Sequence, residues 1–435
     1  MNVSAHHTAA TNASIGSSRH GYFVIADLSG YTRFVTENDL EHAQGVLHDL
    51  ISLIIEQLGS PLEFVELEGD AVFVYAREEA VVNPERLLDL MEACYAAFRL
   101  RVEQMTRNTF CPCTACRSIL MLDLKCVAHH GRFVVQQTPK GPQLVGPDVV
   151  LVHRLLKNSV IETTGIQAYA LLTETFVARA YPPAEVVSSV EQVRADSTSA
   201  SAAPPTPGGA GGREAQADAA APSTAQTTAL DLPLHLEEVE RFGAVRTRVL
   251  DLAACVERHR ARFRENLDAC PIDLEIVTTV PAPARFVWGY ITDPVLRLRW
   301  QTDIRGVRST PAGNGRTDVG SSSHCDHGGY VMEHRIVDWQ PFTRITKHSQ
   351  STGSSLTKPP PCQADFFFED RPDGTCVLRF AVRLRHVGLF TRLLFKAVKP
   401  LVRREWEGHF RLLQKAVAGD LAAQAALMSQ SPAPG

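Results

Sequence analysis

The chain has 435 residues, a net charge of −4 and 44% hydrophobic residues, which is enough for two or three domains that each bury a core. This charge balance gives no reason to expect nucleic acid as a partner. No apolar run reaches the length of a membrane span, and residues 1–20 lack a signal-peptide core. We therefore expect a cytoplasmic protein whose cysteines are thiols or metal ligands rather than disulfides.

The first candidate site begins in residues 22–37, after a segment, 1–19, that we expect to be disordered. Tyr22 to Ala26 is an apolar run typical of a buried strand, and Asp27 follows it. The next residues form a turn that leads into a helical pattern: Leu28, Ser29, Gly30 and Thr32. A carboxylate at a strand end can hold Mg²⁺, and the N–H groups of the turn can hold phosphate oxygens. The alternative is that Asp27 caps the helix.

A second carboxylate follows at the tip of a predicted hairpin. Residues 64–76 form two strand-like runs around Glu68-Gly69-Asp70, and residues 40–58 before them have apolar residues at helical spacing. If the strands that carry Asp27 and Asp70 are neighbours in one sheet, the two carboxylates can share a pair of divalent metal ions.

These two stretches resemble the catalytic domain of class III nucleotidyl cyclases, whose first strand reads Phe-x-Asp-Ile-x-Gly-Phe-Thr and whose hairpin ends in Ile-Gly-Asp. The resemblance covers roughly the first half of the chain. It implies that Asp27 and Asp70 hold Mg²⁺ or Mn²⁺ against a nucleoside triphosphate. It also places Glu66 where cyclases that read guanine carry Glu. The alternative for Glu66 is a solvent-facing strand residue.

A third motif bears on catalysis. Gly146, Val149 and Arg154 match the family's Gly-Asp-x-Val-Asn-x-Ala-x-Arg motif, which implies that Arg154 contacts phosphate during catalysis. Val150 stands where the family has asparagine and cannot form its hydrogen bonds. We therefore predict a degenerate cyclase-like domain that binds metal and nucleotide. The alternatives are an active guanylate or adenylate cyclase, and a domain that only forms a homodimer.

The densest cluster of metal-ligand residues is a run of cysteines in a predicted loop. Cys111, Cys113 and Cys116 lie within six residues, and Cys126 or the His129-His130 pair follows. Three thiolates and a fourth ligand can bind one structural Zn²⁺, although the spacing is not that of a standard zinc ribbon. An iron–sulfur centre and free loop thiols are the alternatives.

Composition divides the remainder of the chain. Residues 193–231 are rich in Ala, Pro, Gly and Ser, which predicts a flexible linker or an insertion. Residues 232–268 read as a hairpin and a connecting helix that can complete the cyclase-like domain, which begins at residue 20 and reaches 192. A new domain is predicted over 269–420, followed by a disordered tail over 421–435.

Residues 269–420 resemble the START-like, polyketide-cyclase-like helix-grip fold. A strand, a helix containing Val287-Trp288, Asp293-Pro294, Trp300, several strands and a long helix over 390–417 carry the resemblance. It implies an apolar cavity for a lipid or another hydrophobic ligand. We expect Phe366 and Phe368 to face inward on one strand. The inner face of the last helix is predicted to carry Leu393, Leu394, Val398 and Leu401.

Two polar features of this second part each have alternative roles. His324-Cys-Asp-His327 can bind a metal or line the cavity mouth, but adjacent strand residues point to opposite faces, which favours ordinary polar positions. The basic residues of the last helix can touch anionic lipid, although solvation is the simpler expectation. Taken together, the sequence predicts an α+β protein of two domains: a ferredoxin-like cyclase-type sheet and a helix-grip sheet with a long C-terminal helix.

Overall fold

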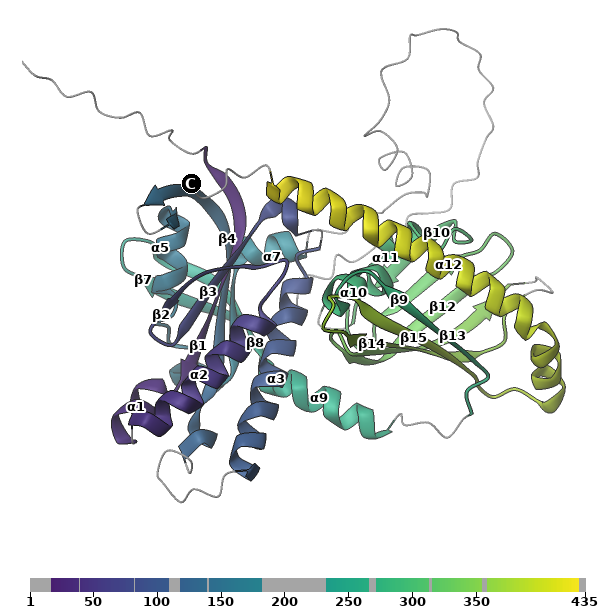
Figure 1. The fold of residues 1–435 in the computed structure, drawn as a ribbon, viewed down its shortest axis with the longest axis horizontal. Coiled ribbons are helices and arrows are strands. Elements are labelled where there is room, and N and C mark those ends of the chain that lie inside the picture. The colour runs from purple at the N-terminus through teal and green to yellow at the C-terminus, as the bar shows by residue number, and fades with distance from the viewer. Residues whose placement is uncertain are drawn as a thin grey trace, which may run out of the picture.

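The computed structural model describes residues 17–38, 40–81, 83–108, 118–138, 141–181, 232–265, 271–312, 315–353 and 358–429. It is a mixed α+β structure with two separate β-sheets and a long C-terminal helix (Figure 1), as the sequence predicts. The described helices include none that is both long enough and apolar enough to cross a membrane.

The first sheet has the strand order β2-β3-β1-β4-β6-β8-β7, with β5 paired to β4. Its central strands are apolar on both faces, because helices or loops cover both sides. The strands are β1 (Arg19–Ser29), β2 (Glu63–Glu68), β3 (Ala71–Arg77), β4 (Asp123–Thr138), β5 (Gly141–Val145), β6 (Tyr169–Thr173), β7 (Leu234–Val239) and β8 (Gly243–Asp251). The hairpin β7–β8 joins this sheet through β6, so residues 182–231 fall between two parts of one sheet.

Helices of the first part cover the two faces of this sheet. Phe23 and Phe73 face one apolar cluster, and Val24 and Val74 face the other, because side chains alternate along each strand. The helices are α1 (Tyr31–Glu37), α2 (Leu40–Gln57), α3 (Arg86–Asn108), α5 (Pro147–Arg154), α6 (Val160–Thr164), α7 (Glu174–Ala180) and α9 (Leu252–Glu265), with short 3-10 turns η1 (Glu78–Ala80) and η2 (Ile119–Met121).

The second sheet is antiparallel and has the order β10-β11-β12-β13-β14-β15-β9. Its strands are β9 (Leu274–Val280), β10 (Gly306–Thr310), β11 (Ser322–Asp326), β12 (Val331–Gln340), β13 (Arg344–Thr352), β14 (Cys362–Asp370) and β15 (Cys376–Leu384). The helices are α10 (Ala284–Thr292), α11 (Pro294–Leu298) and α12 (Leu389–Ser429), and Figure 1 shows α12 lying along this sheet.

Two local expectations are corrected by the structure. Residues 119–128 alternate as in one strand, and the sequence predicts that Gly131 to Gln136 form a second strand paired with it, but residues 123–138 form the single strand β4, which runs alongside β1 from Asp123 to Phe133. The predicted inner face of the last helix is also wrong. Leu393, Leu394 and Leu401 are 64%, 55% and 69% exposed, whereas Phe410 is 2% exposed and packs against the sheet.

Charged and polar side chains of α3 join the two sheet domains. The Asp89 carboxylate accepts hydrogen bonds from the indoles of Trp288 (3.1 Å) and Trp339 (3.3 Å). Arg316 forms ion pairs with Glu92 and, at 3.7 Å, with Asp89. Burial raises the pKa of Asp89 to about 7, against the opposing charges of Arg86 and Arg316. The contact between the domains therefore includes charged side chains that are fully buried.

Candidate functional site

Asp27 and Asp70 meet at the end of β1. Strands β1 and β3 are antiparallel with Ala26 opposite Val72, and this register, continued by two residues, places Leu28 opposite Asp70. Asp70 accepts a hydrogen bond from the backbone N–H of Leu28, and its carboxyl group is within hydrogen-bonding reach of that of Asp27. The arrangement expected from the strand order is therefore present.

The ionised form of Asp70 is disfavoured at this position. Burial, and then the charge of Asp27, raise the pKa of Asp70 to about 7. Two carboxylates this close repel each other, so either one of them is protonated or a cation lies between them. A divalent cation bound between the two carboxylates would relieve this repulsion.

Lys125 supplies the positive charge next to this pair. It lies opposite Asp27 on β4, and its Nζ is 3.0 Å from Oδ2 of Asp27 and 3.2 Å from the backbone oxygen of Leu156. An ammonium group beside one carboxylate neutralises part of the charge that a metal would otherwise neutralise. A metal ion at Asp27 must therefore compete with Lys125 or share the carboxylate with it.

In the turn after β1, the backbone of Gly30 lies very close to the backbone of Met121. Gly30 adopts φ 86° as the residue before α1, and a Cβ there would lie 2.9 Å from the backbone oxygen of Met121. Only glycine fits such a position without strain. The hydroxyl of Ser29 is buried and has no hydrogen-bond partner among the described residues, while Thr32 is exposed on α1.

The other predicted nucleotide residues are not gathered around the two aspartates. Glu66 is exposed on β2 next to a β-bulge. Arg154 ends α5, and its Nη1 is 2.9 Å from Oε2 of Glu240 in the turn between β7 and β8. Val150, in place of the family's asparagine, is 47% exposed on α5. The role of Arg154 in contacting phosphate stays a prediction, since in this conformation it pairs with a carboxylate.

Of the predicted cysteine ligands, the structure describes Cys126. Cys111, Cys113 and Cys116 lie outside the described residues. Cys126 is fully buried on β4 within the apolar core, and burial, with a smaller contribution from the charge of Asp27, raises the pKa of its thiol to about 12. Because metals bind the thiolate, this environment disfavours Cys126 as the fourth ligand.

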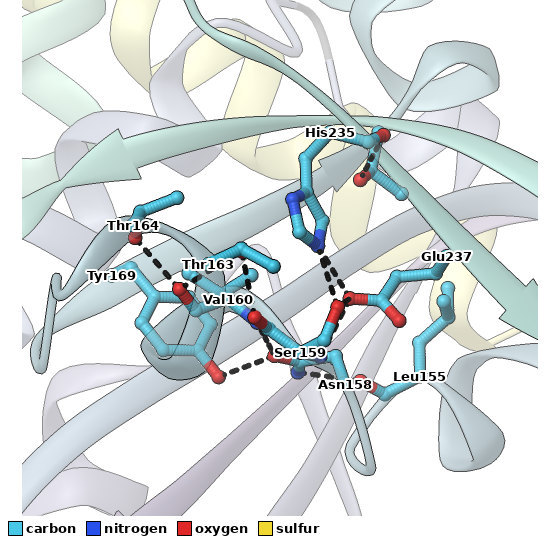
Figure 2. A network of polar contacts seen from close by, with 10 residues as sticks. Leu155, Asn158, Ser159, Val160, Thr163, Thr164, Tyr169, His235 and Glu237 are labelled. Carbon is cyan, nitrogen blue, oxygen red and sulfur yellow. Dashed lines mark hydrogen bonds and ion pairs between the residues drawn. The ribbon is translucent and has the colours of Figure 1, made fainter.

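A polar network that the sequence analysis missed joins the turn after α5 to β7 (Figure 2). Oε1 of Glu237 accepts hydrogen bonds from the backbone N–H of Ser159 at 2.7 Å and from its hydroxyl at 2.9 Å, and pairs with Nε2 of His235. Asn158 accepts a hydrogen bond from the Tyr169 hydroxyl at 2.8 Å. The pKa of Tyr169 is raised to about 12, by burial first and then also by the charges of Asp27 and Glu237.

Serine, histidine and glutamate are the components of a hydrolytic triad, but their geometry here is different. The same histidine nitrogen, Nε2, faces both the Ser159 hydroxyl at 3.4 Å and the Glu237 carboxylate. The hydroxyl already donates to Glu237, so no relay from acid to histidine to serine exists. The network instead fixes the turn after α5 against β7. No signal in the sequence indicated it, because on β7 the polar residues His235 and Glu237 are buried whereas Leu234 and Leu236 are exposed.

Comparisons with known proteins give partial matches. Residues 47–164 match a family described as a protein of unknown function, DUF2652. An uncharacterized protein of Mycobacterium tuberculosis is 36% identical over 101 residues, which are 23% of this chain and 46% of that protein. The matched segment thus spans less than half of that relative's length.

Solved structures resemble parts of the chain at low sequence identity and low TM-score. The adenylyl cyclase CyaB from P. aeruginosa matches with a TM-score of 0.32 and 10% identity, over 54% of this chain and 95% of that one. DynU16, a protein in the dynemicin biosynthetic locus, matches with a TM-score of 0.26 and 19% identity, over 34% of this chain and 48% of that one.

Proposed function

We propose that the first sheet domain binds a nucleoside triphosphate together with Mg²⁺ or Mn²⁺ at Asp27 and Asp70, and that it acts as a degenerate, class III cyclase-like signalling domain. The observation that carries the proposal is the juxtaposition of these two carboxyl groups, with the raised pKa of Asp70. Hard divalent cations prefer carboxylate oxygens and in turn hold the phosphates of a nucleotide. The N–H groups of Ser29 and Gly30, in the turn that follows Leu28, are our proposed donors to the phosphate oxygens.

Efficient cyclisation is not part of the proposal. Transition-state charge on a transferring phosphoryl group is normally stabilised by preorganised cationic groups. Here the guanidinium of Arg154 is engaged by Glu240, and Val150 cannot donate a hydrogen bond. Glu66 remains our proposed guanine-reading residue, because an exposed carboxylate on β2 can accept the paired N–H donors of guanine.

The experiment is to incubate the full chain with GTP or ATP and Mn²⁺, to measure bound nucleotide, and to resolve the products. We expect binding, with GTP preferred over ATP, and nucleotide that is recovered largely unchanged. Rapid release of cyclic nucleotide and pyrophosphate would establish the active cyclase alternative. Absence of binding by either nucleotide would leave the alternative of a domain that only associates with a second copy.

We further propose that two copies of the chain associate through this domain. Val145 and Val150 lie five residues apart where β5 leads into α5, and they are 44% and 47% exposed. Apolar side chains grouped on a surface favour association. Sedimentation of the full chain tests this: a dimer is expected, and Val150→Asp should shift it toward the monomer.

For the second sheet domain we propose a hydrophobic ligand, as its helix-grip resemblance implies. Trp288, Phe366 and Phe368 face the interior and are buried. They also contact other rings, with centroids 5.2 Å apart for Trp288 and Phe368 and 4.8 Å apart for Phe366 and Phe380. A ligand would therefore have to displace some of these contacts. Mass spectrometry of compounds that co-purify with the protein tests whether one does.

A further inference from the structure

Four polar side chains from three separate segments meet at one end of the second sheet domain. Asp303 lies in the loop after α11, and His327 follows β11. Glu405 and His409 are one turn apart on α12, so they share a face of that helix. Candidate ligand atoms of Asp303, Glu405 and His409 all lie within 4.8 Å of one another. None of these residues belongs to the proposed nucleotide site.

Asp303 and His409 have the spacing of two ligands on one metal ion. Nε2 of His409 is 3.2 Å from Oδ1 of Asp303. Two ligand atoms at about 2.0–2.1 Å from a tetrahedral Zn²⁺ are roughly 3.3 Å apart. Glu405 is exposed on α12, so a change in its side-chain rotamer suffices to bring its carboxylate closer. His409 and Asp303 therefore already lie at the distance that two ligands of one Zn²⁺ ion require.

The orientation of His409 also fits a metal ligand. Its Nδ1 is 3.3 Å from the backbone oxygen of Trp300, and a carbonyl oxygen only accepts, so Nδ1 carries a proton. A neutral His409 then directs the lone pair of Nε2 at the Asp303 carboxylate. Two electron-rich atoms at this distance need a cation between them, which is either a proton or a metal ion. A backbone carbonyl on the second ring nitrogen is the usual support for a metal-binding histidine.

His327 contacts the other oxygen of Asp303. Its side chain is 10% exposed, and its Nδ1 is 2.9 Å from Oδ2 of Asp303. This contact orients the Asp303 carboxylate from the side opposite His409. The ring of His327 stacks on Tyr330 with centroids 4.8 Å apart, which holds the ring in place. A buried imidazole thus faces the carboxylate that also faces His409.

We propose that Asp303, Glu405 and His409 bind a divalent transition-metal ion of the Zn²⁺ type, with His327 positioning Asp303 from its other oxygen. Nitrogen and carboxylate ligands from three side chains leave a fourth position open, the composition of zinc sites that admit water or a small molecule. Asp303 is 34% exposed in its side chain, so the ion has a path from solvent. The bound ion would tie α12 to the loop after α11 and to the end of β11.

The experiment is titration of the metal-free full chain with Co²⁺ and Zn²⁺. Cobalt at this site is expected to give visible d–d bands without the near-ultraviolet thiolate charge transfer that the cysteine cluster would produce. Asp303→Asn and Glu405→Gln should each remove those bands and weaken Zn²⁺ binding by at least about 10-fold. Glu407→Gln, an exposed carboxylate on the same helix, and His324→Gln, an exposed histidine on β11, should leave both readouts unchanged.

Unfolding in the presence of chelator provides the check on folding. Asp303→Asn and Glu405→Gln should melt near the wild-type temperature without metal, but only wild type should gain stability when Zn²⁺ is added, because the ion binds the native state. If the wild-type chain shows no thiolate-free Co²⁺ bands, the proposal is wrong. It is equally wrong if Asp303→Asn retains as much of this signal as Glu407→Gln, since the two histidines would then simply be ion-paired to Asp303.

Discussion

The pKa of Asp70 sets the pH above which both carboxyl groups of the proposed metal site are ionised. Its pKa of about 7 in the folded protein compares with about 3.9 for an aspartate in an unfolded chain. Between these values the folded state holds a proton that the unfolded state has lost. Ionising the group in the folded state therefore costs free energy, and its contribution to stability falls as the pH rises from about 4 to 7.

The first prediction follows from this sign. Asp70→Asn should stabilise the metal-free protein near pH 7.5 and should lose the decline in stability that Asp70 causes between pH 4 and 7. The measurement is the free energy of unfolding against pH for wild type and variant. Asp89, whose pKa is also about 7, contributes equally to both, so the difference between the curves isolates Asp70. Parallel curves would show that the pKa of Asp70 is not raised in the folded protein.

A second prediction concerns competition between protons and metal at the same pair. Metal ions bind the carboxylate form, so the apparent affinity for Mn²⁺ should fall by up to about 10-fold per pH unit below pH 7. Binding measured at pH 5.5 and at pH 7.5 tests this. A pH-independent affinity would place the ion elsewhere, away from Asp70.

At the scale of single elements, α12 shows why sequence periodicity misassigned a helix face. Leucines occur on more than one side of residues 389–401, so periodicity alone could not choose between faces. Leu393 and Leu394 are exposed, and the helix packs instead through the face that carries Phe395, Val402, Trp406 and Phe410. The choice depends on which side of the helix meets the sheet, which the sequence of the helix does not encode.

The third prediction tests this corrected face. Phe410→Ala should lower the free energy of unfolding by about 3–5 kcal/mol, because it leaves a cavity beside Phe380 and Trp300. Leu394→Ala, on the exposed stretch, should change it by less than about 0.5 kcal/mol. Denaturant unfolding of both variants is the measurement. Equal losses would mean that the first half of α12 is also covered.

Other elements were predictable because their local pattern and their environment agree. The apolar run of β1 and the Glu68-Gly69-Asp70 turn specify a buried strand and a hairpin, and they bring Asp27 and Asp70 together. The middle of β4 was harder to predict. Its His129-His130-Gly131 run reads as a turn, but His129 is satisfied inside the sheet by Thr173 at 2.9 Å. Such long-range partners are invisible in a local pattern.

At the scale of the whole molecule, charged residues of α3 hold the two domains together. In the sequence these residues have the pattern of a helix face exposed to solvent. Asp89 and Glu92 of α3 are 2% and 3% exposed. Their partners are more than 190 residues away in the chain, at Trp288, Arg316 and Trp339. A buried ion pair is costly to break, because removal of one partner strands the other charge in the interior.

The fourth prediction tests this junction. Arg316→Ala should lower the stability of the folded chain by about 3–5 kcal/mol, and tryptophan fluorescence should change early in unfolding because Trp288 and Trp339 donate to Asp89. Arg308→Ala, an exposed arginine on β10, is the matched control. A variant at Arg316 that unfolds like the control would show that the junction contributes little.

The claim on which the account of function depends is that Asp27 and Asp70 bind a metal–nucleotide complex, and calorimetric titration of the full chain with GTP in the presence of Mn²⁺ tests it most directly. We predict saturable binding by wild type and by Asp49→Asn, a surface carboxylate paired with Arg101. Asp27→Asn should bind at least about 100-fold more weakly, because one carboxylate ligand of the metal is lost. Undiminished binding by Asp27→Asn, or no binding by wild type, would contradict the account.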